Sequence, residues 1–245
     1  MASEQDMQAR LAVVQQRIAA AAARAGKRPE EVRLVAVSKT MPAERVAQAA
    51  RVGIHCFGEN WVEEAEEKLP QVRELLGAEA ASSLCWCLIG HLQSRKARRA
   101  VELFAEIHSV DSLRLALRLD RIAGERGRTL PVLLEVNISG EASKEGLAAG
   151  EWPADAVQTA ALYTEIEAIL ALPRLEVQGL MTVAPLVTDP EAVRPTFRRL
   201  RELRDALRVR FPSHAWQELS MGMSDDYEVA IEEGSTMVRL GRALF

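Results

Sequence analysis

The chain alternates short apolar segments with longer helical ones eight times, and this alternation is the feature that most constrains its fold. The apolar segments are rich in residues that favour strands, and the segments between them favour helices. A strand, a crossover helix and a further strand make a parallel pair, so eight such units predict a parallel sheet. The predicted strands are residues 33–38, 55–57, 85–89, 106–110, 131–138, 175–183, 215–219 and 237–241, and the predicted helices 43–51, 61–76, 94–101, 112–126, 155–172, 191–210 and 225–233.

Eight units in 245 residues predict one closed (β/α)8 TIM barrel spanning residues 1–245 as a single domain. An extra N-terminal helix is predicted at residues 3–25, where apolar residues recur at three- and four-residue spacing. The alternative is an open doubly wound sheet, which would normally carry a glycine-rich phosphate turn after its first strand. Here the first strand runs into Ser38, Lys39 and Thr40, and no such glycine motif occurs.

Composition limits the classes of function. A net charge of −4, with 48% apolar and 27% charged residues, is typical of a globular protein and argues against general nucleic-acid binding. We expect neither membrane insertion nor secretion, because no run of 18 apolar residues and no signal-peptide pattern occurs. The three cysteines, Cys56, Cys85 and Cys87, are too few for a disulfide scaffold and indicate a reducing, cytoplasmic setting.

Lys39 is the first candidate for chemistry, because barrel active sites form at the carboxyl ends of the strands. A lysine there is either a solvated rim residue or a desolvated amine that can form a Schiff base with a carbonyl group. If the barrel closes, Arg239 on the last strand lies close to Lys39 and favours the neutral amine. Strand alternation places Arg239 on the same face as Gly241, which we interpret as the barrel interior, and a buried structural arginine is the alternative.

Residues 220–226 predict an anion site, since barrels often bind phosphate with the loops after the last two strands. Ser224 can cap the following helix, or it can offer its hydroxyl to an anion, and Gly241 lets the backbone approach closely. Asp225 and Asp226 oppose an anion site unless they point outward. His91 is either a general base or a capping or core histidine.

We expect no metal site. No second histidine lies at ligand spacing from His91, and Cys85 and Cys87 alternate along a strand.

Several motifs together resemble the YggS/PROSC family of pyridoxal 5'-phosphate (PLP) homeostasis proteins. The resemblance is collinear, covers nearly the whole chain, and implies a class III PLP fold like the barrel domain of alanine racemase. The motifs are LVAVSKT at 34–40, FGEN at 57–60, WCLIGHLQ at 86–93, EVNISGE at 135–141, GLM at 179–181, LSMGMSDD at 219–226 and GSTMVRLG at 234–241.

The resemblance implies a role for particular residues. Lys39 matches the lysine that forms the Schiff base with PLP, and Arg239 matches the arginine that faces the pyridine nitrogen. The remaining implied cofactor-binding residues are Ser224 with Ser220 as a further candidate, the backbone at Gly241 and Arg242, and the pocket residues Asn60, His91 and Met181. The chain departs from the family at Arg242, where relatives carry a small residue, at Cys87 and Arg95, and in ending at Phe245.

The leading hypothesis is therefore a cytoplasmic, monomeric protein that holds PLP and acts in its homeostasis, with PLP-dependent apo-enzymes as recipients. The alternative is a low-activity PLP-dependent amino-acid racemase. The expected single barrel leaves no residues for the second domain with which a racemase completes its acid and base pair. A third hypothesis, from the residues alone, is a barrel enzyme whose lysine forms a Schiff base with a sugar-phosphate aldehyde.

Overall fold

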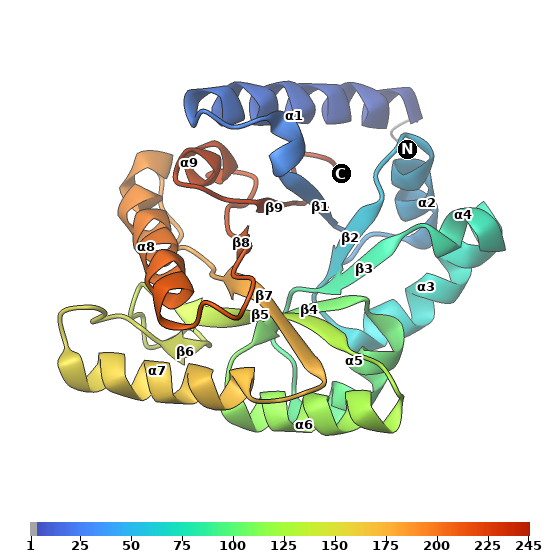
Figure 1. Cartoon of the computed structure of the whole chain (residues 1–245). Coiled ribbons are helices and arrows are strands. Elements are labelled where there is room, and N and C mark those ends of the chain that lie inside the picture. The colour runs from blue at the N-terminus through green and yellow to red at the C-terminus, as the bar shows by residue number, and fades with distance from the viewer. Residues whose placement is uncertain (1–3) are drawn as a thin grey trace.

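Eight parallel strands close into a barrel in the computed structural model, which describes residues 4–245 (Figure 1). The first strand pairs with the second and with the last, and the fourth pairs with the fifth, so every barrel strand has two neighbours. The predicted barrel is confirmed. Its strands are β1 (Arg33–Val37), β2 (Cys56–Glu59), β3 (Cys85–Leu88), β4 (Glu106–Val110), β5 (Leu130–Asn137), β7 (Leu175–Met181), β8 (Glu218–Ser220) and β9 (Met237–Leu240).

Helices surround the barrel on the outside. The first, α1 (Glu4–Arg24), lies beside the last helix and α2, so helices also cover the junction of β9 with β1. Its stripe of Met7, Leu11, Val14 and Ile18 is buried, which confirms the predicted extra helix; Ser3 lies outside the described residues. The other helices are α2 (Ala43–Arg51), α3 (Val62–Leu76), α4 (Ala78–Ser82), α5 (Ala97–Leu103), α6 (Leu113–Glu125), α7 (Ala156–Leu170), α8 (Arg194–Arg210) and α9 (Tyr227–Glu232), with 3₁₀ turns at Pro29–Glu31, Ser94–Lys96 and Pro190–Val193.

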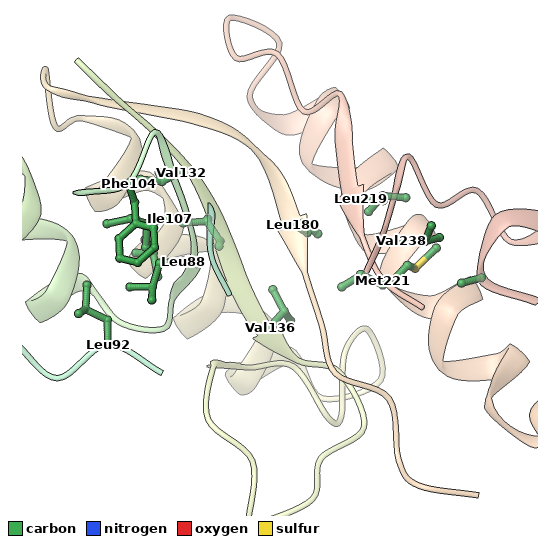
Figure 2. Close-up of a cluster of buried hydrophobic side chains, with 14 of the residues drawn as sticks. Leu88, Leu92, Phe104, Ile107, Val132, Val136, Leu180, Leu219, Met221 and Val238 are labelled. Atoms are coloured by element: carbon green, nitrogen blue, oxygen red, sulfur yellow. The ribbon is translucent and has the colours of Figure 1, made fainter. Parts of the chain in front are cut away.

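Alternate residues of each strand serve two different packing layers. Strand residues such as Leu88, Ile107 and Val238 belong to the main core, which extends into the surrounding helices (Figure 2). Leu133, Met181 and Met237 instead form a separate small cluster within the barrel. Polar side chains share this interior, among them Glu106, His108, Ser220 and Arg239.

Two segments differ from the predicted order. A two-residue strand, β6 (Leu147–Ala148), pairs with β5 outside the closed ring, and α4 follows α3 directly. The strand predicted at 215–219 is shifted to β8, because Trp216 has a φ of 44° and so cannot continue an extended chain. Across residues 4–245, no helix combines the length and the apolar character that crossing a bilayer requires.

Candidate functional site

A cavity of about 210 Å³ opens at the carboxyl ends of β1 and β9, where the loops after β7 and β8 form its other walls. Five of the nine residues predicted to bind the cofactor line it: Lys39, Ser224, Arg239, Gly241 and Arg242. The loop after β7 adds Pro185 to Val187 at the rim, with Leu186 92% exposed. The structure thus gathers residues that are up to 203 positions apart in the sequence.

Lys39 follows β1 in a tightly held bend. Its side chain is exposed and lines the cavity. The next residue, Thr40, has a φ of 63°, which is unfavourable for a β-branched side chain and needs support from its surroundings. Glu64 supplies part of that support, since the Thr40 N–H donates to Glu64 Oε1 at 2.6 Å. The buried Ser38 lies on the other side of Lys39, and its N–H donates to the Gly58 carbonyl at 3.0 Å.

A buried ion pair behind Lys39 was not predicted. Lys68 Nζ donates to the Ser38 carbonyl at 2.7 Å, to Glu59 Oε1 at 2.8 Å and to Glu64 Oε1 at 2.6 Å. These bonds use all three of its protons. Ser38 Oγ also donates to Glu59 Oε1 at 2.8 Å. Burial raises the pKa of Glu59, while Lys68 opposes that shift. We call Lys68, Glu59 and Glu64 the lysine clamp, because the three side chains hold the backbone on both sides of Lys39.

Arg239 forms the inner wall of the cavity. It is only 4% exposed, and its Nη1 donates to Ser220 Oγ and its Nη2 to the Thr182 carbonyl, each at 2.8 Å. Because β9 pairs with β1, Arg239 and Lys39 line the same cavity, as predicted. Burial lowers the pKa of Arg239 to about 10, so the guanidinium stays charged at neutral pH.

Two predicted residues lie deeper in the barrel than the cavity lining. Ser220 is fully buried between Arg239 and His108, and its Oγ is 3.4 Å from His108 Nδ1. Met181 is fully buried in the interior cluster with Leu133 and Met237. Ser220 therefore contacts the cavity wall through Arg239, whereas Met181 lies outside the cavity lining.

The loop after β8 presents Ser224 to the cavity. Ser224 does not cap the next helix, so that expectation is wrong: Asp226 occupies the N-cap of α9, and its Oδ1 accepts the Met223 N–H at 2.6 Å. This bond closes the turn and leaves Ser224 Oγ at the cavity, where it accepts the Ala243 N–H at 3.4 Å.

The two acidic residues of this loop also line the cavity, but each is held by a bond of its own. Asp226 is buried, and Asp225 is exposed and forms an ion pair with Arg242. The side chain of Arg242 is itself 79% exposed. Arg242 lines the cavity, and its guanidinium neutralises Asp225.

Asn60 and His91 lie outside the lining of the Lys39 cavity. His91 is exposed, its Nδ1 is 3.0 Å from Asp111 Oδ2, and it lines a different cavity with Asp111 and Glu145. Asn60 is half-buried after β2, and its carbonyl packs so closely on Gly90 that a Cβ there would lie 2.4 Å from the oxygen. The loops after β2 and β3 are thus fixed against each other at this point.

Comparison with known proteins identifies the family. The model of the alanine racemase N-terminal domain matches residues 10–245. The chain is 42% identical over 244 residues to the pyridoxal phosphate homeostasis protein of Escherichia coli K12, with 98% of this chain and 96% of that protein covered. The chain belongs to the family of pyridoxal phosphate homeostasis proteins. The family member of Aquifex aeolicus is 39% identical over 236 residues, covering 96% of both chains.

Solved structures show the same fold. PipY of Synechococcus elongatus, a structure with PLP bound, has a TM-score of 0.81 and 37% identity, covering 98% of this chain and 99% of PipY. An alanine racemase of Clostridium difficile superposes with a TM-score of 0.64 at 15% identity, covering 88% of this chain and 55% of the racemase. The homeostasis family thus shares its barrel with alanine racemase.

The cysteines correct one step of the sequence argument. Cys85 and Cys87 are two residues apart on β3, so their side chains lie on the same face of the strand and not on alternating faces. Both meet Cys56 of β2, and the three sulfur atoms lie within 4.8 Å of one another. The alternation argument against a ligand set was therefore wrong, while the expectation of no metal site is not tested by this geometry.

Proposed function

We propose that the chain binds PLP in the Lys39 cavity and acts in cytoplasmic PLP homeostasis, without substantial amino-acid catalysis. The observation that carries this proposal is the meeting of Lys39, Arg239 and Ser224 in one cavity. Their chemistry matches the three ends of the cofactor, which are an aldehyde, a pyridine nitrogen and a phosphate. The PLP-bound structure of the family member PipY supports the same ligand.

The residues of the cavity fit this group. The exposed amine of Lys39 is free of the bonds that immobilise Lys68, and it is suited to a reversible Schiff base with the aldehyde. Ser224 Oγ and the main chain at Gly241 and Arg242 are suited to the phosphate. Of the other predicted residues, Ser220 acts through Arg239 from inside the barrel, whereas Met181, Asn60 and His91 lie outside the lining of this cavity.

Arg239 favours holding the cofactor over catalysis. When PLP is bound to an enzyme, it supplies an electron sink that stabilises carbanions. Arg239 can only donate hydrogen bonds, is charged at neutral pH, and is fixed by Ser220 and Thr182. A ring nitrogen that faces such a group stays unprotonated, which weakens the electron sink.

The carboxylates of the cavity also favour holding the cofactor over catalysis. A racemase needs acid and base groups on both sides of the substrate carbon. Asp225 is occupied by Arg242 and Asp226 by the Met223 N–H. Lys39 is then the cavity group best placed to move a proton. The racemase remains the alternative, because the barrel is shared with alanine racemase.

Absorption spectroscopy tests the site. Purified protein with added PLP should show a visible Schiff-base band, which borohydride should reduce, and peptide mapping should find the label on Lys39. Lys39→Ala should abolish the band. Lys96→Ala is the matched control, since Lys96 lies outside the lining of the cavity and pairs with Glu63. A band that persists in Lys39→Ala would contradict the assignment, and the absence of any band would favour the sugar-phosphate alternative.

Activity and transfer are tested separately. The loaded protein should show no sustained, Lys39-dependent racemisation of free amino acids; ordinary enzymatic turnover would favour the racemase. Incubation with a PLP-dependent apo-enzyme should restore that enzyme's activity faster than the same concentration of free PLP, if such enzymes are the recipients. Sedimentation should give the mass of a monomer.

A further inference from the structure

The end of the barrel opposite the Lys39 cavity holds a cluster of all three cysteines. Cys56 is the first residue of β2 and Cys85 the first residue of β3, and the two are partners in the sheet register. Cys87 lies two residues further along β3, on the same face. The Sγ atom of Cys87 is 3.6 Å from that of Cys56 and 3.8 Å from that of Cys85. All three are free thiols.

These separations match those of a thiolate metal centre. Zinc binds cysteine sulfur at about 2.3 Å in a tetrahedral arrangement, which places two sulfur ligands about 3.8 Å apart. The separations of 3.6 and 3.8 Å from Cys87 Sγ match this spacing, and the Sγ atoms of Cys56 and Cys85 lie within 4.8 Å of each other, so a small adjustment of these two side chains completes the set. Because the thiols come from paired strands, the backbone holds them at this spacing before any ion arrives.

The surroundings of the thiols suit a bound cation with thiolate ligands. Glu106 lies beside them, with its Oε1 3.8 Å from Cys85 Sγ and its Oε2 3.8 Å from Cys87 Sγ. Arg33 binds both oxygens of Glu106, at 2.6 and 2.8 Å, and brings a positive charge next to the cluster.

An entry path exists on the same side. Cys56 and Cys87 are buried, but Cys85 is partly exposed and the side chain of Arg33 is 33% exposed. An ion can therefore reach the sulfur atoms from solvent past Cys85.

We propose that Cys56, Cys85 and Cys87 bind one thiophilic divalent ion of the zinc and cadmium type. Three sulfur–metal bonds form, and the thiol protons are released to solvent as the ion binds. Three thiolates and a divalent ion leave one net negative charge, while Arg33 and Glu106 beside them balance each other. The fourth position faces the opening beside Cys85 and takes a water molecule. Soft thiolate ligands favour this class of ion over magnesium or calcium.

Cadmium binding tests the site in the full-length protein, reduced and free of other metals. Cd²⁺ should bind with one-to-one stoichiometry, produce a sulfur-to-metal charge-transfer band in the ultraviolet, and protect all three thiols from alkylation. Cys85→Ser should weaken binding by more than about tenfold, because changes even to outer-shell partners cost roughly 10–100-fold. Cys85 is partly exposed, so this variant should keep the native circular dichroism.

His91→Ala is the matched control, because His91, Asp111 and Glu145 form a separate set of possible ligands at the other end of the barrel. It should leave cadmium binding unchanged. Glu106→Gln keeps the three thiols and should weaken binding by roughly 10-fold or more through the second shell. Equal affinity in Cys85→Ser and the unaltered protein, or loss of binding in His91→Ala, would overturn the proposal.

Discussion

Replacing Lys68 by methionine removes the cation of the lysine clamp and keeps most of the apolar stem. Among the described residues, the change leaves Glu59, which is fully buried, with only the Ser38 hydroxyl as a donor to its Oε1. Glu59 Oε2 has no hydrogen-bond partner within residues 4–245. The variant therefore places a nearly unsupported carboxylate inside the protein, directly behind the segment that carries Lys39.

The expected loss of unfolding free energy is about 3–5 kcal/mol, the usual cost of removing one partner of a buried ion pair. The summed free energy of the three charge-assisted hydrogen bonds of Lys68 would exceed this value. The variant also avoids the cost of burying the Lys68 ammonium, and this saving reduces the net loss. Lys96→Met is the matched control, because it breaks the pair with Glu63, which is 58% exposed. Such a pair contributes about 0–1 kcal/mol.

Urea unfolding of both variants over a range of pH measures the difference. Burial already raises the pKa of Glu59, so the charged form is the disfavoured one in the fold, and stability is lost as pH rises through that pKa. Without Lys68 this loss grows. The deficit of Lys68→Met relative to the unaltered protein should therefore shrink as pH falls and Glu59 takes up a proton.

The double variant Lys68→Met/Glu59→Gln separates the charge from simple loss of packing. It should recover at least about 1 kcal/mol of the loss in Lys68→Met, since no lone carboxylate at Glu59 remains buried. A cost of Lys68→Met no larger than that of Lys96→Met, or full additivity of the Lys68 and Glu59 changes, would refute the reasoning.

Three further predictions concern other parts of the barrel. Gly222→Ala should lower the free energy of unfolding by about 2 kcal/mol or more, because a Cβ at a φ of 96° would lie 2.6 Å from α9. Gly127→Ala, at a φ of 64° with open space around it, should lower it by only about 1–2 kcal/mol. Equal melting temperatures of the two variants would contradict this prediction. Burial raises the pKa of Glu135 to about 7, so its contribution to stability is present below about pH 4.5 and lost as pH rises to about 7. The melting temperature of Glu135→Gln should therefore fall less over that pH range than that of the unaltered protein. Parallel plots of melting temperature against pH for the two proteins would contradict this prediction. Ser224→Ala should weaken PLP binding by roughly tenfold or more, and Arg242→Ala by less than about threefold, as measured by titration; the reverse order would show that the Arg242 side chain holds the phosphate.

The strands and the barrel could be predicted because their signals are local. Strand β4 was predicted with its observed bounds, 106–110, and the helix at 43–51 likewise. Eight short parallel strands joined by crossover helices can form few sheet topologies, and a closed barrel is one of them. The shifted strand near Trp216 shows the limit, since a positive φ in an apolar segment leaves no trace in its hydrophobicity.

The lysine clamp was missed although the sequence contains a signal for it. Lys68 occupies the stripe of α3 that is otherwise apolar, and a lysine at such a position needs a buried partner. The partner could not be deduced, because Glu59 lies on another element and only the folded barrel brings the two together. The cysteine cluster was missed for a simpler reason, which is that residues two apart on a strand were assigned to opposite faces.

The position of Arg239 depends on residues that no motif singled out. Although burial raises the pKa of Glu106, its hydrogen bonds with His108 and Arg33 lower it to about 2, so Glu106 is an acceptor at neutral pH. His108 must then donate from Nε2 to Glu106, at 3.0 Å, and burial lowers the pKa of His108 and keeps it neutral. Its Nδ1 is left as an acceptor for the Ser220 hydroxyl, whose oxygen in turn accepts from Arg239. The arginine that faces the cavity is thus oriented by a chain of hydrogen bonds that runs through the barrel to the Glu106 beside the cysteines.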